Sequence, residues 1–199
     1  MKYLAILLLI TASVFAGEYQ VDKAAENMVK FISDAPIEDF EGVTSSIDGY
    51  LFWEGDDLLN QSELYFEVDL NTVDTGIGLR NRHMRENYLH TDKFPKTHFT
   101  AKLIKADKLN ENEFSVEAEG MFFVHGIKKN KIIKGKIEKV EKDKYKVSTK
   151  FIVALSEYDI EIPSLMFYKI DENMELTVEF YLEKNAAIEG ENEWITSFI

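Results

Sequence analysis

Cysteine is absent from the sequence, and basic residues are outnumbered by acidic ones, 23 to 36. The first absence excludes disulfide bonds, thiol catalysis and zinc sites built on thiolates, and a domain of this size can bury enough apolar surface without disulfides. The excess of acid gives a formal net charge of −13. That charge argues against nucleic acid and against an anionic membrane surface as partners, because both attract basic patches.

Long linkers, low-complexity runs and internal repeats are also missing, so the sequence predicts a single folded domain. We place this domain at residues 17–185. Residues 186–199 form a short tail that is first acidic and then apolar. The sequence leaves open whether this tail packs on the domain.

The N-terminus holds the longest apolar run. Lys2 supplies a positive charge, the residues from Tyr3 to Ile10 are almost entirely apolar, and small residues follow up to Ala16. This order is typical of a cleavable signal peptide, and the run is shorter than the roughly 20 apolar residues of a transmembrane helix. We therefore expect residues 1–16 to be removed, and the chain to be periplasmic or secreted without stable membrane insertion.

Patterns of catalytic and metal-binding residues are missing as well. No Gly-x-Ser-x-Gly or Ser-x-x-Lys sequence occurs, and no pair of carboxylates stands out among the acids of the strand faces. The histidines lack the spacing of a metal site; they are His83, His90, His98 and His125. We expect no enzyme, no metal site and no cofactor.

Apolar and polar residues alternate with a period of two through most of the chain, which predicts β-strands with one apolar face. In Leu64–Leu70 every second residue is apolar, and Glu67 and Asp69 lie between. The same alternation recurs at 46–53, 113–124, 133–137, 147–155 and 174–182. Such strands form an antiparallel sheet, and about eight of them can close into a barrel that holds one small ligand. A β-sandwich with a solid core fits the same pattern.

A basic, helix-compatible segment interrupts these strands. It contains Asp74–Gly76, then Arg80–Met84, and then Phe94-Pro95 followed by Phe99. This order resembles the hallmark of the YceI-like family of secreted lipid-binding proteins. In that family an Asp/Ser-Thr-Gly turn precedes an Arg-Asp-x-His-Leu/Met segment, and a Tyr/Phe-Pro pair followed by phenylalanine closes the pattern.

The resemblance extends from Tyr19 to Glu183. Tyr19–Asp22 matches the family's opening Tyr-x-Val-Asp, Glu119–Lys129 resembles its His-Gly hairpin, and Leu155–Ile160 fits the Leu-x-x-Tyr-x-Ile of a subgroup. Three single positions also correspond, a strand phenylalanine, a turn glycine and a strand glycine: Phe31, Gly42 and Gly49.

This chain departs from the family pattern at two places. The His-Ser that follows the opening motif is Glu26-Asn27, and the aspartate of Arg-Asp-x-His is Asn81. If that aspartate pairs with a buried arginine in relatives, Arg80 has a neutral partner here.

The resemblance implies an all-β fold, an antiparallel eight-stranded lipocalin-like barrel with a short helical plug segment at 78–89. It also implies that the interior binds a long-chain lipid (a polyisoprenoid, an isoprenoid quinone or a fatty-acid derivative) for transport, storage or stress response. Two alternatives stay open. One is a hydrolase that uses His83 or His125 at the barrel mouth, and the other is a β-sandwich interaction module without a cavity. The sequence also leaves a homodimer open.

Aromatic residues make up 13% of the chain, and many fall on the apolar strand faces, as in pockets for apolar ligands. We expect Met84, Tyr88 and Leu89 of the plug to face the cavity, so that Met84→Asp weakens lipid binding. The expected ligand-binding residues are Phe31, Trp53, Phe66, Arg80, His83, Met84, Tyr88, Phe122, Val124, Phe151, Val153, Leu176, Val178 and Phe180.

The polar residues of the plug have two interpretations. Arg80, Asn81 and His83 hold the polar head of a ligand, or they brace the plug, with Arg80 satisfying backbone carbonyl groups. Under the first interpretation Arg80 carries an uncompensated charge, and Arg80→Leu weakens binding of a headed lipid but not of an alkane.

Overall fold

The computed structural model describes residues 16–33, 40–162, 164–165, 168–169 and 171–185. The expected tail at 186–199 lies outside these ranges, as does the expected signal peptide apart from Ala16, which is the first residue of β1. Both therefore stay predictions. In the described ranges, no helix has the length and apolar character needed to cross a membrane.

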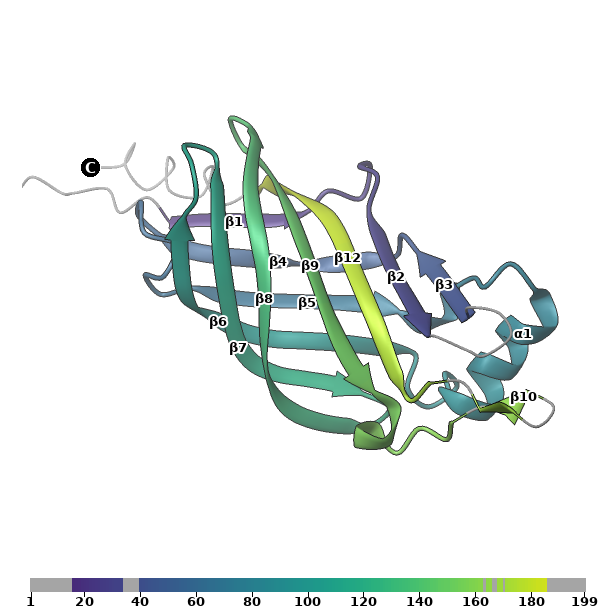
Figure 1. Ribbon diagram of the computed structural model, residues 1–199. Coiled ribbons are helices and arrows are strands. Elements are labelled where there is room, and N and C mark those ends of the chain that lie inside the picture. The colour runs from purple at the N-terminus through teal and green to yellow at the C-terminus, as the bar shows by residue number, and fades with distance from the viewer. Residues whose placement is uncertain (1–15, 34–39, 163, 166–167, 170, 186–199) are drawn as a thin grey trace, which may run out of the picture.

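Eight strands form a closed antiparallel barrel in the order β1-β4-β5-β6-β7-β8-β9-β12, and the pairing of β12 with β1 completes it (Figure 1). The strands are β1 (Ala16–Val21), β4 (Ile47–Glu54), β5 (Glu63–Asp69), β6 (Lys96–Lys108), β7 (Glu113–Val124), β8 (Ile127–Glu141), β9 (Lys144–Ala154) and β12 (Asn173–Lys184). The predicted barrel is confirmed, and the β-sandwich alternative is wrong.

Two further strands, β2 (Met28–Ser33) and β3 (Phe40–Thr44), extend the sheet beside β12. The C-terminal part of β12 pairs with β1, and its N-terminal part pairs with β2. The two strands β1 and β2 therefore lie one after the other along the same edge of β12. Asn27 joins them: its Nδ2 donates to the Asp22 carbonyl at 2.8 Å, and its Oδ1 accepts from the Tyr181 N–H at 3.0 Å. The departure from the family's His-Ser thus supplies a buried bridge.

Gly42 was expected at a turn, and that expectation is wrong, because Gly42 lies inside β3 opposite Phe31 of β2. A Cβ atom at this position would come within 2.5 Å of the Phe31 ring, so the glycine admits a close ring contact. Gly49 lies in a strand as expected. Its φ is +133°, and a Cβ there would meet the Tyr65 carbonyl oxygen at 2.0 Å.

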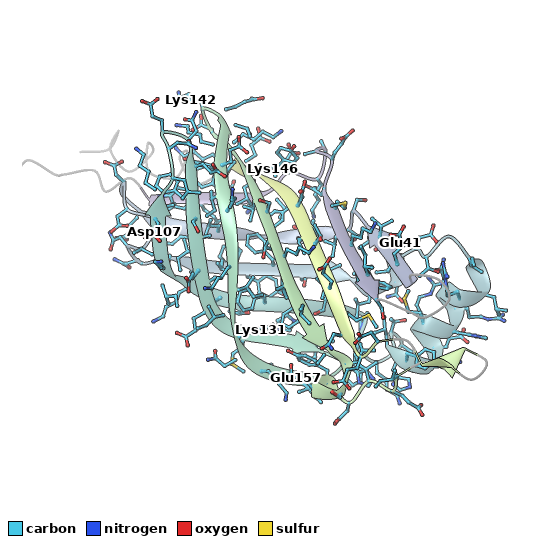
Figure 2. All side chains as sticks on the ribbon, in the orientation of Figure 1. Glu41, Asp107, Lys131, Lys142, Lys146 and Glu157 are labelled. Atoms are coloured by element: carbon cyan, nitrogen blue, oxygen red, sulfur yellow. The ribbon has the colours of Figure 1, made fainter. Side chains whose placement is uncertain are left out.

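Along the strands, most polar residues face solvent and most apolar residues face the interior, as the alternation predicted. Charged side chains such as Asp107, Lys142 and Glu157 project outward (Figure 2). The residues predicted to face inward are buried or are half-buried against the core. They are Trp53, Phe66, Phe122, Val124, Phe151, Val153, Leu176, Val178 and Phe180.

Aromatic rings close the end of the barrel where β4 finishes and β9 starts. The Tyr19 and Trp53 rings stack with centroids 4.6 Å apart. The Tyr145 ring meets Tyr19 edge-on at 5.0 Å and Trp53 at 5.9 Å. Leu182, opposite Tyr145 on β12, is 0% exposed. This packing joins β1 to β4 and β9 through ring contacts.

The remaining elements are short. They are η1 (Leu70–Thr72), α1 (Gly78–His83), the π-helical turn η2 (Met84–Tyr88), η3 (Leu155–Tyr158) and the small hairpin of β10 (Ser164–Leu165) and β11 (Tyr168–Lys169). The expected plug segment at 78–89 is thus helical over most of its length, and α1 lies at one end of the barrel (Figure 1).

Candidate functional site: the barrel interior and its plug

The barrel interior contains a cavity of about 140 Å³. Its wall is almost entirely apolar and draws residues from all the long strands. The lining residues are Val29, Ile47, Leu51, Leu64, Phe66, Val68, Thr97, His98, Phe99, Leu103, Val116, Ala118, Phe122, Ile133, Gly135, Ile137, Val147, Thr149, Phe151, Leu176, Val178 and Phe180.

Some of the expected ligand-binding residues lie on this wall: Phe66, Phe122, Phe151, Leu176, Val178 and Phe180. Others are placed elsewhere: Phe31, Trp53, Arg80, His83, Met84, Tyr88, Val124 and Val153. Ligand contact stays a prediction for both groups. Wall residues such as Leu51, Ala118 and Ile137 were not among the expected ligand-binding residues, although the same alternation of apolar positions places them inside.

Aromatic rings cross the interior and limit its size. Phe66 of β5 and Phe180 of β12 lie on strands that are not neighbours, and their ring centroids are 4.7 Å apart. Phe122 of β7 meets Phe151 of β9 edge-on at 5.8 Å. A long ligand must therefore displace rings that now touch one another, and these rings can move without breaking strand pairing.

The polar side chains of the wall are occupied or uncharged. The Thr97 hydroxyl donates to the Phe123 carbonyl at 2.6 Å, and the Thr149 hydroxyl donates to the Lys134 carbonyl at 2.7 Å. Burial, together with nearby Lys128, lowers the pKa of His98 and so favours its neutral form. The cavity is therefore suited to an apolar occupant.

The plug presents one apolar side to the barrel and a basic side to solvent. Met84 is buried, and Tyr88 and Leu89 are half-buried against the core, whereas Arg82 and His83 are exposed. None of these residues lines the cavity, so the plug covers the core at the barrel end without reaching the cavity wall.

The turn before α1 is tied to the helix by one hydrogen-bond network. Arg80 donates from Nε to the Thr75 hydroxyl at 2.9 Å and from Nη2 to the Thr75 carbonyl oxygen. The Thr75 hydroxyl donates to Asn81 Oδ1 at 2.6 Å, and the Thr75 N–H reaches the same oxygen at 2.8 Å. These contacts are those of the bracing interpretation of Arg80. A ligand contact for Arg80 stays a prediction.

The contacts of Asn81 explain why asparagine is suitable at this position, where the family pattern has aspartate. Its Nδ2 donates to Asp74 Oδ1 at 2.7 Å, and that oxygen accepts from the Gly76 N–H at 2.8 Å. The bond from Asn81, and next the bond from Gly76, lower the pKa of Asp74. An aspartate at position 81 would instead face the Asp74 carboxylate.

We predict that Asn81→Asp destabilises the protein in a pH-dependent way, and that Asp74→Ser restores it. Two carboxylates at this distance cannot both ionise cheaply, so the pKa of the pair in the folded state rises above the unfolded value of about 3.9. The stability deficit of the variant is therefore largest near neutral pH and shrinks as the pH falls toward about 4. Urea unfolding of wild type, single and double variants at several pH values measures it. A deficit that does not change with pH would contradict the carboxylate pair.

Two histidines far apart in the sequence meet at the end of the plug. His90 Nδ1 and His125 Nε2 are 2.8 Å apart, and His125 Nδ1 lies 3.0 Å from the Tyr158 carbonyl oxygen. A carbonyl only accepts, so His125 Nδ1 carries the proton and Nε2 accepts from His90. The contact joins the plug, the β7–β8 hairpin and η3. In the structure both histidines have positive φ, 46° and 50°, as turn residues do, and their spacing in the sequence does not predict that they meet.

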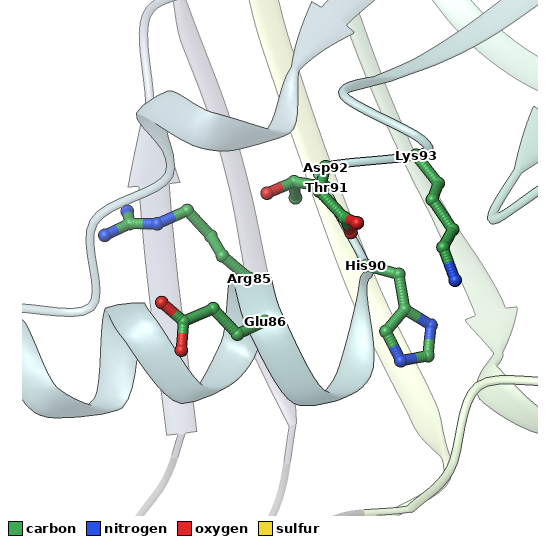
Figure 3. Close-up of a pocket in the computed structure, with 6 residues that line it drawn as sticks. All are labelled: Arg85, Glu86, His90, Thr91, Asp92 and Lys93. Atoms are coloured by element: carbon green, nitrogen blue, oxygen red, sulfur yellow. The ribbon is translucent and has the colours of Figure 1, made fainter.

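A second hollow, of about 380 Å³, lies on the surface at this end of the plug (Figure 3). It is lined by Arg85, Glu86, His90, Thr91, Asp92 and Lys93. Charges of both signs surround it, and none of its lining residues is an apolar residue, so it is unsuited to a lipid chain. Within the described ranges, no group of three or more His, Asp or Glu side chains is arranged to hold a metal ion.

The fold is similar to those of several solved structures. Burkholderia cenocepacia BcnA superposes with a TM-score of 0.66 at 12% identity, over 81% of this chain and 98% of that chain. A polyisoprenoid binding domain from Saccharophagus degradans, implicated in plant cell wall breakdown, gives 0.65 at 14% identity, over 84% and 98%. The Campylobacter jejuni YCEI protein gives 0.59 at 16% identity, over 75% and 86%. At these identities the likeness shows the fold alone.

The sequence itself provides the family assignment. No curated protein sequence matches this chain significantly. The model of the YceI-like domain, however, matches residues 19–182, which span all eight barrel strands and the plug. The chain therefore belongs to the YceI-like domain family.

Proposed function

We propose that the protein binds a long apolar lipid inside its barrel, and that the ligand is a polyisoprenoid, an isoprenoid quinone or a fatty-acid derivative. The role would be transport, storage or a stress response, in the periplasm or outside the cell, and without catalysis. The observation that carries the proposal is the apolar cavity inside a closed barrel. The similar fold of the polyisoprenoid binding domain from Saccharophagus degradans supports it.

The size of the cavity sets a condition on this function. Burying a methylene group is worth about 0.8 kcal/mol, and micromolar affinity needs about 8 kcal/mol beyond an association cost of about 4 kcal/mol or more. A ligand must therefore bury roughly 15 or more methylene groups. Ligand pockets usually measure about 300–1,000 Å³, and the cavity measures about 140 Å³. Binding thus requires the phenylalanine rings to move apart.

The hydrolase alternative has little support in the geometry. His83 is exposed on the plug, away from the cavity. Both ring nitrogens of His125 are engaged, one with His90 and one with the Tyr158 carbonyl, so neither is directed at a nucleophile.

Mass spectrometry of organic extracts tests the proposal directly. We predict that the purified protein carries a long-chain lipid in stoichiometric amount, and that Ala118→Phe lowers this amount at least about tenfold, because the added ring fills the cavity that Ala118 lines. Circular dichroism should show the strands of the variant intact.

Ala24→Phe serves as the matched control, because Ala24 is exposed in the turn between β1 and β2. It should leave the lipid content unchanged. Undiminished lipid in a folded Ala118→Phe variant would place the ligand outside the cavity and contradict the proposal.

A further inference from the structure

Tyr158 carries a polar group that the fold does not use. Its side chain is 0% exposed, and its hydroxyl has no hydrogen-bond partner. Among the described residues it is the one buried side-chain polar atom in that condition. Buried polar groups in folded proteins are nearly always hydrogen-bonded, so such a group calls for an explanation.

Hydrogen bonds hold the backbone around Tyr158, and they help to fix the position of its ring. His125 Nδ1 donates to the Tyr158 carbonyl at 3.0 Å, and the Ile160 N–H donates to the Leu155 carbonyl at 3.1 Å. Leu155 and Ile160 are both buried. The Leu-x-x-Tyr-x-Ile segment is thus an anchored turn that inserts one tyrosine into the barrel core.

Phe122 connects this tyrosine to the cavity. The Phe122 side chain lines the cavity, and its ring meets the Tyr158 ring edge-on with centroids 6.0 Å apart. A long ligand must displace rings of this wall. Displacing Phe122 would extend the cavity toward the ring that Phe122 now covers.

The chemistry of the site favours one kind of head group. Burial, and next the charge of Glu157, raise the pKa of Tyr158, so the hydroxyl stays protonated and can donate. None of the cavity-lining residues is a lysine or an arginine. A phosphate would be desolvated there without a cation, whereas a carbonyl, ether or hydroxyl oxygen needs only a donor.

We propose that the Tyr158 hydroxyl donates a hydrogen bond to a neutral oxygen on the head of the bound lipid. The head lies at the plug end of the barrel, and the tail extends toward the end that Tyr19 and Trp53 close. The ligand class is an uncharged oxygen-bearing lipid, such as an isoprenoid quinone. This inference rests on the proposed lipid-binding function and adds the orientation and the head chemistry of the ligand.

The test is Tyr158→Phe, with two probes and two measurements. Decylubiquinone carries carbonyl oxygens, and squalene is a polyisoprenoid without a head. The loss of one neutral hydrogen bond should raise the dissociation constant for decylubiquinone about 3- to 10-fold. The constant for squalene should not change. The melting temperature of the delipidated variant should equal or exceed that of wild type, because the substitution removes a hydroxyl that has no partner.

Tyr145→Phe is the matched control. Tyr145 is a half-buried tyrosine of the opposite barrel end, and its hydroxyl is hydrogen-bonded with Tyr19. Its removal should lower the melting temperature and leave the preference for quinone over squalene unchanged.

Each other outcome overturns the inference in a distinct way. An equal loss for both probes would assign Tyr158 to packing alone. A lower melting temperature with unchanged binding would show that the hydroxyl is satisfied within the protein, for example by a buried water. Binding of squalene without any effect of Tyr158→Phe on the quinone would remove Tyr158 but leave the lipid-binding function intact. Failure of wild type to bind either probe would overturn both.

Discussion

Trp53→Ala is expected to lower the free energy of unfolding by about 3–5 kcal/mol, the usual cost of removing a buried tryptophan side chain. Trp53 is 7% exposed, stacks on Tyr19 and meets Tyr145 edge-on. The substitution leaves a cavity between β1, β4 and β9, where the barrel closes on itself. Urea unfolding followed by circular dichroism measures the loss.

Trp53→Phe is the control, because it keeps an aromatic ring on Tyr19 and should cost much less. The lipid content of both variants should match that of wild type wherever the fold persists, since Trp53 is not on the cavity wall. A folded Trp53→Ala protein with normal stability and no lipid would contradict this assignment. It would instead support the sequence-based expectation that Trp53 touches the ligand.

Thr75→Val is expected to cost about 2–3 kcal/mol of folding stability, although the two side chains have nearly the same shape. The Thr75 hydroxyl accepts from Arg80 and donates to Asn81, and Thr75 is 7% exposed. Valine removes the bond from the charged Arg80 Nε, worth about 1.5–3 kcal/mol, and the bond to Asn81 Oδ1, worth about 0.5–1.5 kcal/mol. Asn81 Oδ1 keeps the Thr75 N–H, and both partners are half-buried, so the expected cost stays below the sum of the upper values.

Chemical denaturation and limited proteolysis together measure this effect. New cleavage between Thr75 and Leu89 would show that the plug opens before the barrel unfolds. Thr100→Val is the control, because Thr100 is exposed on β6 and should change stability by less than about 0.5 kcal/mol. Equal stability of wild type and Thr75→Val would mean that the network contributes nothing to holding the plug.

The barrel was predictable because one signal, alternation with a period of two, runs through most of its strands. That signal placed Phe122, Phe151 and Phe180 inside, and the structure buries them. The helical plug was predictable from the order Asp-Thr-Gly and Arg-Asn-x-His. Gly42 was assigned to a turn because it matched a turn glycine of the family pattern. Its place in β3 goes with a close contact with Phe31, which depends on the pairing of β2 with β3, and such pairing leaves no local trace in sequence.

The candidate site was predictable only in part, since a lining residue is defined by its neighbours as well as its face. Trp53 and Val124 are buried as the alternation requires, but neither side chain lines the cavity. The contact of His90 with His125 depends on where the chain returns after the plug. Tyr158 was visible as part of a motif, yet its unpartnered hydroxyl is a property of the packed core.

The pairing of β1 with β12 has a consequence for the order in which the protein can fold. Tyr19 pairs with Lys184, so the first and last strands must meet before the barrel exists. Contacts between residues so distant in sequence form slowly, because the chain loses the entropy of closing a long loop before strand pairing stabilises the closed form. A chain emerging from the ribosome would therefore remain an open sheet until β12 is made. That open state exposes its apolar face to solvent, and it is prone to aggregate until β12 pairs with β1 and β9.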